Sequence, residues 1–183
     1  MNHPLKTLLA SAALALACAT PGQAAAATRD EIDAGVREAL GHLKEHSSAG
    51  YELSQKAAGV LVFPTVVKAG LGVGGEYGEG ALLVKGAPVA YYNVASASVG
   101  LQAGAQTRSQ MLLFMNEKVL DTFRKSRDWK AGIDGSVAVA NVGAGGSLDT
   151  KTVQQPIIGF IFSNKGLMAN LNFEGTKITQ IER

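Results

Sequence analysis

The chain has 183 residues, of which 17 are Lys or Arg and 15 are Asp or Glu, so its formal net charge is +2 at pH 7. This length suits one domain. So small a net charge is not typical of proteins that bind polyanions, and nucleic acid is therefore not expected as a partner. Any anion-binding site has to come from a local cluster of basic residues.

The first residues have the pattern of a secretory signal peptide. Lys6 precedes the apolar run TLLASAALALA, which is too short to span a bilayer, and small residues follow it. We expect a signal peptide over residues 1–24, with cleavage after Ala24 and a periplasmic or secreted protein. Cys18 leaves an alternative open, because it stands where a lipoprotein cysteine would stand. The signal would then be residues 1–17, and lipidated Cys18 would anchor the protein to a membrane.

A helix is predicted directly after this segment. Thr28 and Glu31 have the spacing of a capping box, and apolar residues then recur at helical intervals up to His46. A short second helix is expected over residues 50–58. From there the apolar pattern changes to period two, which indicates strands.

Several separate strands are expected in the rest of the chain. GVLVFPTVV predicts one that is interrupted or ended at Pro64, Ala81–Val84 a second, and YYNVASASVGLQAGAQ the longest, followed by SQMLLFM. Asn116 is a candidate N-cap for a helix that buries Val119, Leu120 and Phe123. Residues 157–163 and 167–173 are predicted to form a hairpin, and residues 176–181 a last strand. The predicted fold class is α+β, with an N-terminal helix, a mostly antiparallel, strongly curved sheet and one inserted helix.

The glycine-rich segment KAGLGVGGEYGEG, residues 68–80, raises the question of a nucleotide site. Gly70, Gly72 and Gly75 fit the pattern G-x-G-x-x-G, but that fingerprint has to open a helix. The glycines that follow oppose a helix, since each costs about 1 kcal/mol relative to alanine. We therefore expect no nucleotide. Alternate glycines on one face of a strand allow close packing and curvature, and residues 75–80 are predicted to form a turn.

No catalytic or metal-binding pattern stands out in the sequence. There is no G-x-S-x-G or H-E-x-x-H motif, and the three histidines lie at positions 3, 42 and 46, outside the strand-rich part. His42 and His46 have a spacing that could place both on one metal ion, but no third ligand is evident. We expect a protein that is not an enzyme and that has no cofactor or metal.

One local basic cluster is a candidate lipid-binding site. Arg124, Lys125, Arg127 and Lys130 surround Trp129; basic residues are attracted to anionic membranes, and Trp favours the membrane interface. The alternative is an ordinary solvated helix end, where cations interact favourably with the helix dipole.

The strand-rich part of the chain resembles a known family. The blocks KAAGVLVFPTVVKAGLGVGGEYGEGALLV, VGLQAGAQTRSQMLLFMNEKVLDTF, WKAGIDGSVAVANVGAGG and IIGFIFSNKGLMANLNFEG are similar to those of the SYLF domain, also called the Ysc84-type actin-binding domain. The resemblance spans residues 32–181 and implies a single SYLF-like domain over residues 28–183. Lys68 matches the lysine of its VVKAG block, and Lys165 that of its KGL block.

The resemblance implies a lipid-binding module. Members of the family bind lipids, particularly phosphoinositides in eukaryotes, and some fungal and plant members bind actin. Actin is not expected as a partner in a periplasm, so we expect binding to anionic phospholipid or to a membrane surface. A structural or protein-interaction module of the cell envelope, without a lipid function, is the alternative. The preferred lipid, the protein partner, the oligomeric state and the process served stay open.

Overall fold

The structure is a computed structural model. It describes residues 26–140, 148–163, 166–168 and 172–183, without the side chains of residues 71–72, 98–105 and 167. The expected signal peptide, Cys18 and Lys165 lie outside the described residues. The described elements, in chain order, are α1 (Arg29–His46), α2 (Ser48–Lys56), β1 (Gly59–Val84), β2 (Ala87–Phe114), α3 (Glu117–Lys125), β3 (Asp128–Lys130), β4 (Ala138–Val139), α4 (Thr150–Val153), β5 (Ile157–Ser163), β6 (Gly166–Leu167) and β7 (Lys177–Ile181).

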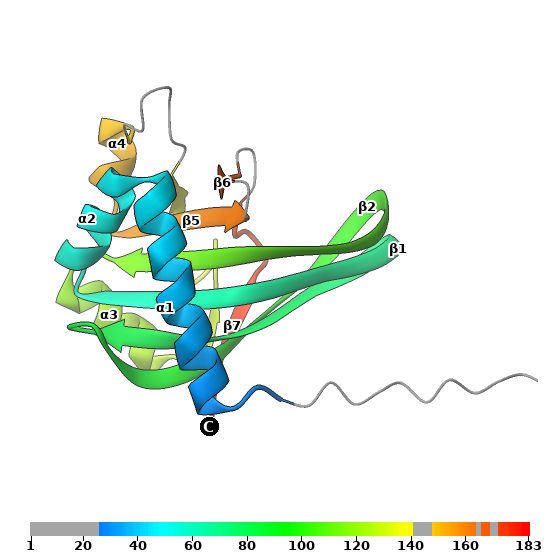
Figure 1. The fold of residues 1–183 in the computed structure, drawn as a ribbon, viewed down its shortest axis with the longest axis horizontal. Coiled ribbons are helices and arrows are strands. Elements are labelled where there is room, and N and C mark those ends of the chain that lie inside the picture. The colour runs from blue at the N-terminus through cyan, green and yellow to red at the C-terminus, as the bar shows by residue number, and fades with distance from the viewer. Residues whose placement is uncertain (1–25, 141–147, 164–165, 169–171) are drawn as a thin grey trace, which may run out of the picture.

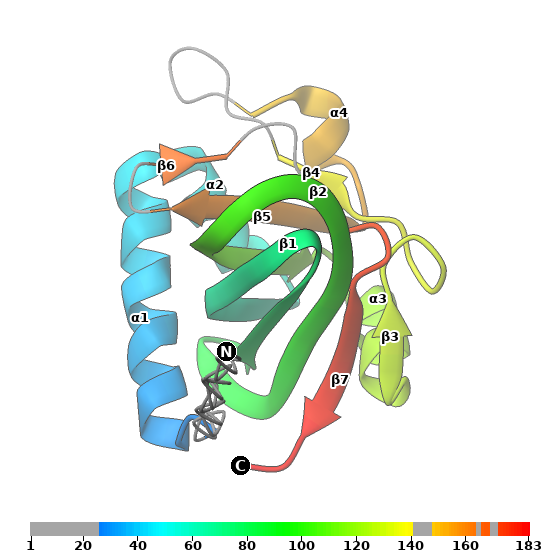
Figure 2. The same ribbon diagram turned by 90° about the vertical axis from the view of Figure 1, so that its right-hand side faces the viewer.

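β2 is the centre of the sheet. It pairs antiparallel with β1 along nearly its whole length, with β7 near its start and with β5 near its end. β3 extends the sheet beyond β7, and β4, the one parallel partner among these strands, lies beside β5. The sheet curls strongly, so that β2 arches around β1 (Figure 2). The expected α+β class with a curved, mostly antiparallel sheet is therefore confirmed.

The N-terminal helices cover one face of the sheet (Figure 1). The predicted capping box is present: Thr28 Oγ1 accepts from the Glu31 amide at 3.3 Å, and Glu31 Oε2 accepts from the Thr28 amide at 2.8 Å. α1 buries Ile32, Val36, Ala39 and Leu43 against the sheet. Among the described residues, none of the helices has both the length and the hydropathy needed to cross a bilayer.

The sheet is buried on both faces near the helices. Along VLVF, Val60 and Val62 pack in the cluster under α1, whereas Leu61 and Phe63 pack in a second cluster with α3. The predicted helix after Asn116 is confirmed, with the Asn116 side chain accepting from the Val119 amide at 3.0 Å. Because both faces are covered, these strand segments are continuously apolar rather than alternating.

The expectation of several short strands between residues 59 and 115 is wrong. β1 continues through Pro64, which lies at a shift in the β1–β2 register between Phe63 and Val66. A proline is tolerated at such an irregularity because no ladder hydrogen bond is required of it there. The predicted turn over residues 75–80 is also strand. The actual turn is Lys85–Gly86, whose φ values of 53° and 79° are those of a two-residue hairpin loop.

Glycines explain how so long a hairpin stays compact. β1 and β2 fold back on themselves together at the right-hand end of Figure 1. A Cβ atom on Gly70 would lie 2.3 Å from the Cα of Gly74, and one on Gly80 would lie 2.0 Å from the carbonyl oxygen of Val62. The two halves of β1 therefore approach each other at glycines. The prediction that these glycines serve packing and curvature is confirmed.

The C-terminal part of the sheet agrees closely with the prediction from the sequence. β5 has the predicted bounds, and β6 pairs with it antiparallel as the start of the predicted hairpin. The return strand is shorter than expected, since residues 172 and 173 are not in a strand and residues 169–171 lie outside the description. β7 confirms the predicted last strand.

Candidate functional site

The predicted basic cluster lies on the surface at one end of the molecule. Arg124 and Lys125 are in the last turn of α3, Arg127 directly precedes β3, and Lys130 is the last residue of β3; all four side chains are exposed. Within the described part of the chain, none of the four forms an ion pair within 4.0 Å. The cluster is therefore free to meet an anion.

Trp129 does not share that surface, so its predicted role at a membrane interface is wrong. Its side chain is 2% exposed, and its ring packs edge-on against Phe123 with centroids 5.7 Å apart. Side chains alternate along the short strand β3, which explains why Trp129 is buried beside exposed neighbours: Asp128 and Lys130 point outward, and Trp129 points into the core. The basic cluster thus has no aromatic anchor from this residue.

Lys68 belongs to a different group of charges. Its Nζ lies 3.8 Å from Glu76 Oε1, and Arg108 Nη2 donates to Glu76 Oε2. The side chains of Glu76 and Arg108 are each 8% exposed, whereas that of Lys68 is 31% exposed. The side-chain amide of Gln110 is oriented with its oxygen towards Arg108, so that Gln110 Oε1 accepts from Arg108 Nε at 3.1 Å. Two cations share one carboxylate, which leaves a net positive charge.

Sequence reasoning missed Glu76 and Arg108. They are 32 positions apart in the chain, and only the folding back of the hairpin brings them together. One signal was available: residues 87–107 contain no charged residue, so Arg108 ends a long uncharged stretch of β2. A lone arginine on the same strand face as Leu112 and Phe114 predicts a buried partner, because buried charges are paired.

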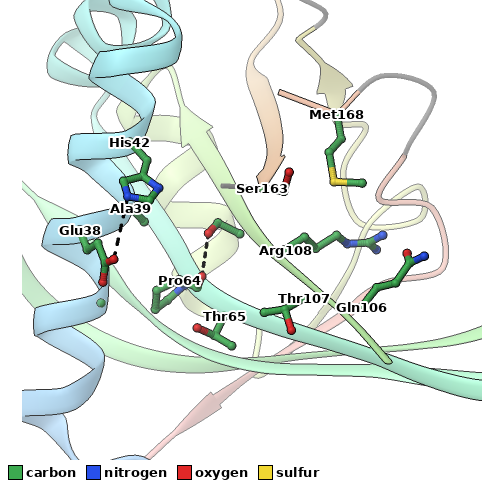
Figure 3. Close-up of a pocket in the computed structure, with 12 residues that line it drawn as sticks. Glu38, Ala39, His42, Pro64, Thr65, Gln106, Thr107, Arg108, Ser163 and Met168 are labelled. Carbon is green, nitrogen blue, oxygen red and sulfur yellow. Dashed lines mark hydrogen bonds and ion pairs between the residues drawn. The ribbon is translucent and has the colours of Figure 1, made fainter. Parts of the chain in front are cut away.

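A cleft of about 610 Å³ opens beside Arg108, between α1, the Pro64 irregularity and the end of β5 (Figure 3). Its polar lining includes His42, Thr65, Gln106 and Thr107. Ser109 Oγ donates to the Pro64 carbonyl at 2.7 Å, so this hydroxyl is held by backbone rather than by a base. Such a lining can hydrogen-bond a polar ligand.

His42 also borders this cleft. Its Nε2 lies 3.9 Å from Glu38 Oε1, a contact drawn as a dashed line in Figure 3. Among the described residues, no three His, Cys, Asp or Glu side chains are placed to share a metal ion. The Glu38 side chain is 74% exposed and so points into solvent.

Three exposed apolar side chains lie along the same stretch of β1 as Lys68. Val67, Val73 and Tyr77 are 43%, 73% and 51% exposed. They are three of the five large apolar residues exposed in the described part of the chain, the others being Val89 and Ile133. A second cleft, of about 490 Å³, lies between this part of β1 and the start of α1 and is lined partly by Val67 and Tyr77.

The structure therefore separates the predicted site residues into two groups. Lys68 lies two residues before the place where β1 folds back, whereas Arg124, Lys125, Arg127 and Lys130 lie around α3 and β3. In Figure 1 the folded-back end of the hairpin and α3 are at opposite ends of the molecule. A flat surface that meets one of these ends does not meet the other.

A comparison with protein-family models gives a match to the C-terminal half of the chain. A family model described as Ysc84, Las17-binding protein actin regulator, matches residues 95–183. The match starts within β2 and includes α3 and every later element, and the resemblance predicted over residues 32–181 is confirmed over this part. No curated protein matches the chain.

Proposed function

This chain belongs to the Ysc84 family through residues 95–183, and from that premise we propose that it is a non-enzymatic module that binds anionic phospholipid at the bacterial cell envelope. The observation that carries the proposal is the surface around Lys68. There a partly exposed cation, in a charge group with net positive charge, lies in the same stretch of β1 as the exposed apolar side chains of Val67 and Tyr77.

This combination of groups suits a lipid surface. Each basic residue near an anionic bilayer contributes about 1 kcal/mol of attraction, and apolar side chains gain from leaving water. The exposed cluster of Arg124, Lys125, Arg127 and Lys130 is a second surface of suitable charge, although its tryptophan is buried. Both surfaces require anionic lipid, so the proposal does not depend on which one makes the contact.

Sedimentation with vesicles tests the proposal. We expect the protein to bind vesicles that contain equal parts of phosphatidylglycerol and phosphatidylcholine, and to bind pure phosphatidylcholine much more weakly. Raising the salt should weaken the binding, because the Debye length falls from about 10 Å at 0.1 M to about 3 Å at 1 M. Equal binding to both vesicles would contradict recognition of anionic lipid.

Failure to bind either vesicle would favour the alternative, a structural or protein-interaction module of the envelope. The family description names a Las17-binding actin regulator. For this chain the alternative is a protein partner in the envelope, because actin is not expected there.

The envelope location has its own test. The intact mass of the protein recovered from expressing cells distinguishes cleavage after Ala24 from an acylated N-terminal Cys18. Either mass supports export, with the second adding a membrane anchor. Recovery of the unprocessed chain from the cytoplasm would contradict an envelope location.

A further inference from the structure

We infer that the folded-back end of the β1–β2 hairpin is the part of this protein that enters the membrane interface. We call this end the hairpin tip and define it as residues 69–75 of β1 and residues 97–105 of β2, which pair with each other. The inference rests on the proposed function, because it says where the anionic membrane is met.

The hairpin tip contains no charged residue. The β1 part is the sequence AGLGVGG, between Lys68 and Glu76, and β2 has no charge from Ala87 to Thr107. Elsewhere charges are frequent, as in α1, which carries ten Lys, Arg, Asp, Glu and His side chains. An uncharged segment avoids the large cost of moving a charge into the interface.

One apolar side chain of the hairpin tip, that of Val73, faces solvent. Val73, at the tip, is 73% exposed, and Val67 and Tyr77 stand on either side of it along β1. Single exposed apolar residues are common on protein surfaces, but three of the five in the described part of the chain lie within this short stretch of β1. Tyr77 also has the amphipathic character of an interfacial residue, since its hydroxyl donates to Glu79 Oε1 at 2.8 Å.

The backbone at the hairpin tip limits how deep it can go. β1 and β2 stay paired on both sides of the fold, as in Val73 with Val99, so many of their amides and carbonyls already have partners. In the described residues, β1 pairs with β2 alone, and its other edge has no strand beside it. An unpaired edge is costly in hydrocarbon, so the hairpin tip enters the interface without spanning the bilayer.

The charges at the base of the tip then lie at headgroup level. Lys68 follows the exposed Val67 and is the partly exposed member of its charge group, at 31%. Glu76 is held between Lys68 and Arg108, so its negative charge is compensated before an anionic headgroup approaches. Attraction at the base and apolar contact at the tip therefore act on the same membrane.

Val73→Asp tests the inference, with Ile133→Asp as a matched control. Ile133 is 78% exposed and lies in the segment between β3 and β4, which is not part of the hairpin tip. On vesicles of equal parts phosphatidylglycerol and phosphatidylcholine, we expect Val73→Asp to weaken partitioning about tenfold or more, which is about 1.4 kcal/mol. The Ile133→Asp variant should stay within about twofold of the wild type, a shift of roughly 0.4 kcal/mol. Both variants should keep the wild-type melting temperature, because both sites are exposed.

A fluorescence measurement reports the contact directly. Val73→Trp and Ile133→Trp each add one indole to the constant background of buried Trp129. Vesicles should shift the emission of Val73→Trp to the blue and leave that of Ile133→Trp unchanged. All proteins are compared in the same processed form, established by intact mass.

Other outcomes would overturn the inference. If Val73→Asp binds as the wild type does, the hairpin tip is not the membrane contact. If changing Arg124, Lys125, Arg127 and Lys130 together to Gln abolishes binding while Val73→Asp does not, the α3 end is the contact instead. If the wild type binds no vesicle, the proposed function fails and the inference fails with it.

Discussion

A Cβ atom placed on Gly70 would lie 2.3 Å from the Cα of Gly74, although both residues belong to β1. The strand reverses its direction so sharply that residues four positions apart touch. Only a residue without a side chain allows this approach. The relationship explains why a single hairpin of β1 and β2 can enclose its own packed interior.

Gly70→Ala should destabilise the fold. The added methyl group meets backbone atoms that cannot move aside easily, and overpacking of this kind costs about 1–3 kcal/mol. Gly41→Ala in α1 is the matched control, because a Cβ there has nothing within 4 Å. It should stabilise the helix by up to about 1 kcal/mol. Chemical denaturation measures both; equal stability of the Gly70→Ala variant and the wild type would contradict the close approach.

Arg108→Met should destabilise the protein strongly. It leaves the Glu76 carboxylate buried with only Lys68, 3.8 Å away, as its cationic partner, and removing one member of a buried pair typically costs about 3–5 kcal/mol. Combining it with Glu76→Gln should cost less than the sum of the single changes, with a coupling of about 0.5–3 kcal/mol.

The exposed ion pair of Lys177 and Asp128, at 3.2 Å, is the control for the changes at Arg108 and Glu76. Its side chains are 46% and 53% exposed, so Lys177→Met should change the free energy of unfolding by no more than about 1 kcal/mol. Similar losses from Arg108→Met and Lys177→Met would show that burial does not strengthen the inner pair.

The capping box at the start of α1 should make stability depend on acid pH. The backbone hydrogen bond from Thr28 holds the pKa of Glu31 below its ordinary value of 4.5. A lowered pKa in the folded state stabilises the protein above the ordinary value, and this contribution is lost as the pH falls below 4.5 towards the lowered pKa. Glu31→Gln keeps a hydrogen-bond acceptor but removes the charge.

Denaturation of both proteins from neutral to acid pH measures that effect. The wild type should be the more stable at neutral pH, and the difference should disappear in acid. A difference that stays constant with pH would mean that the charge of Glu31 contributes nothing.

Trp129 should matter for stability and not for lipid. Trp129→Ala removes a buried ring that packs on Phe123, and such a change costs about 3–5 kcal/mol. Trp129→Phe keeps most of the apolar volume, so it should fold and bind vesicles as the wild type does. Weaker vesicle binding at an unchanged melting temperature would return Trp129 to the membrane contact.

Sequence alone determined the features whose signals lie within a few residues. The capping box of Thr28 and Glu31, the N-cap at Asn116 and the strand 157–163 depend on contacts one turn away or on alternation along one strand. The family resemblance was also evident, because it follows the order of local blocks. The α+β class and the curvature of the sheet followed from these elements together with the glycines.

Only the tertiary structure decided which distant residues meet. Pro64 predicts a strand end locally, yet β1 continues because the irregularity there absorbs the missing hydrogen bond. Trp129 lies among exposed cations in the sequence, but the strand places it in the core beside Phe123. Glu76 and Arg108 form a buried pair only because the hairpin folds back at Gly70 and Gly74. Such contacts depend on the path of the whole chain, and burial, which makes charges pair and apolar rings pack, is a property of that path.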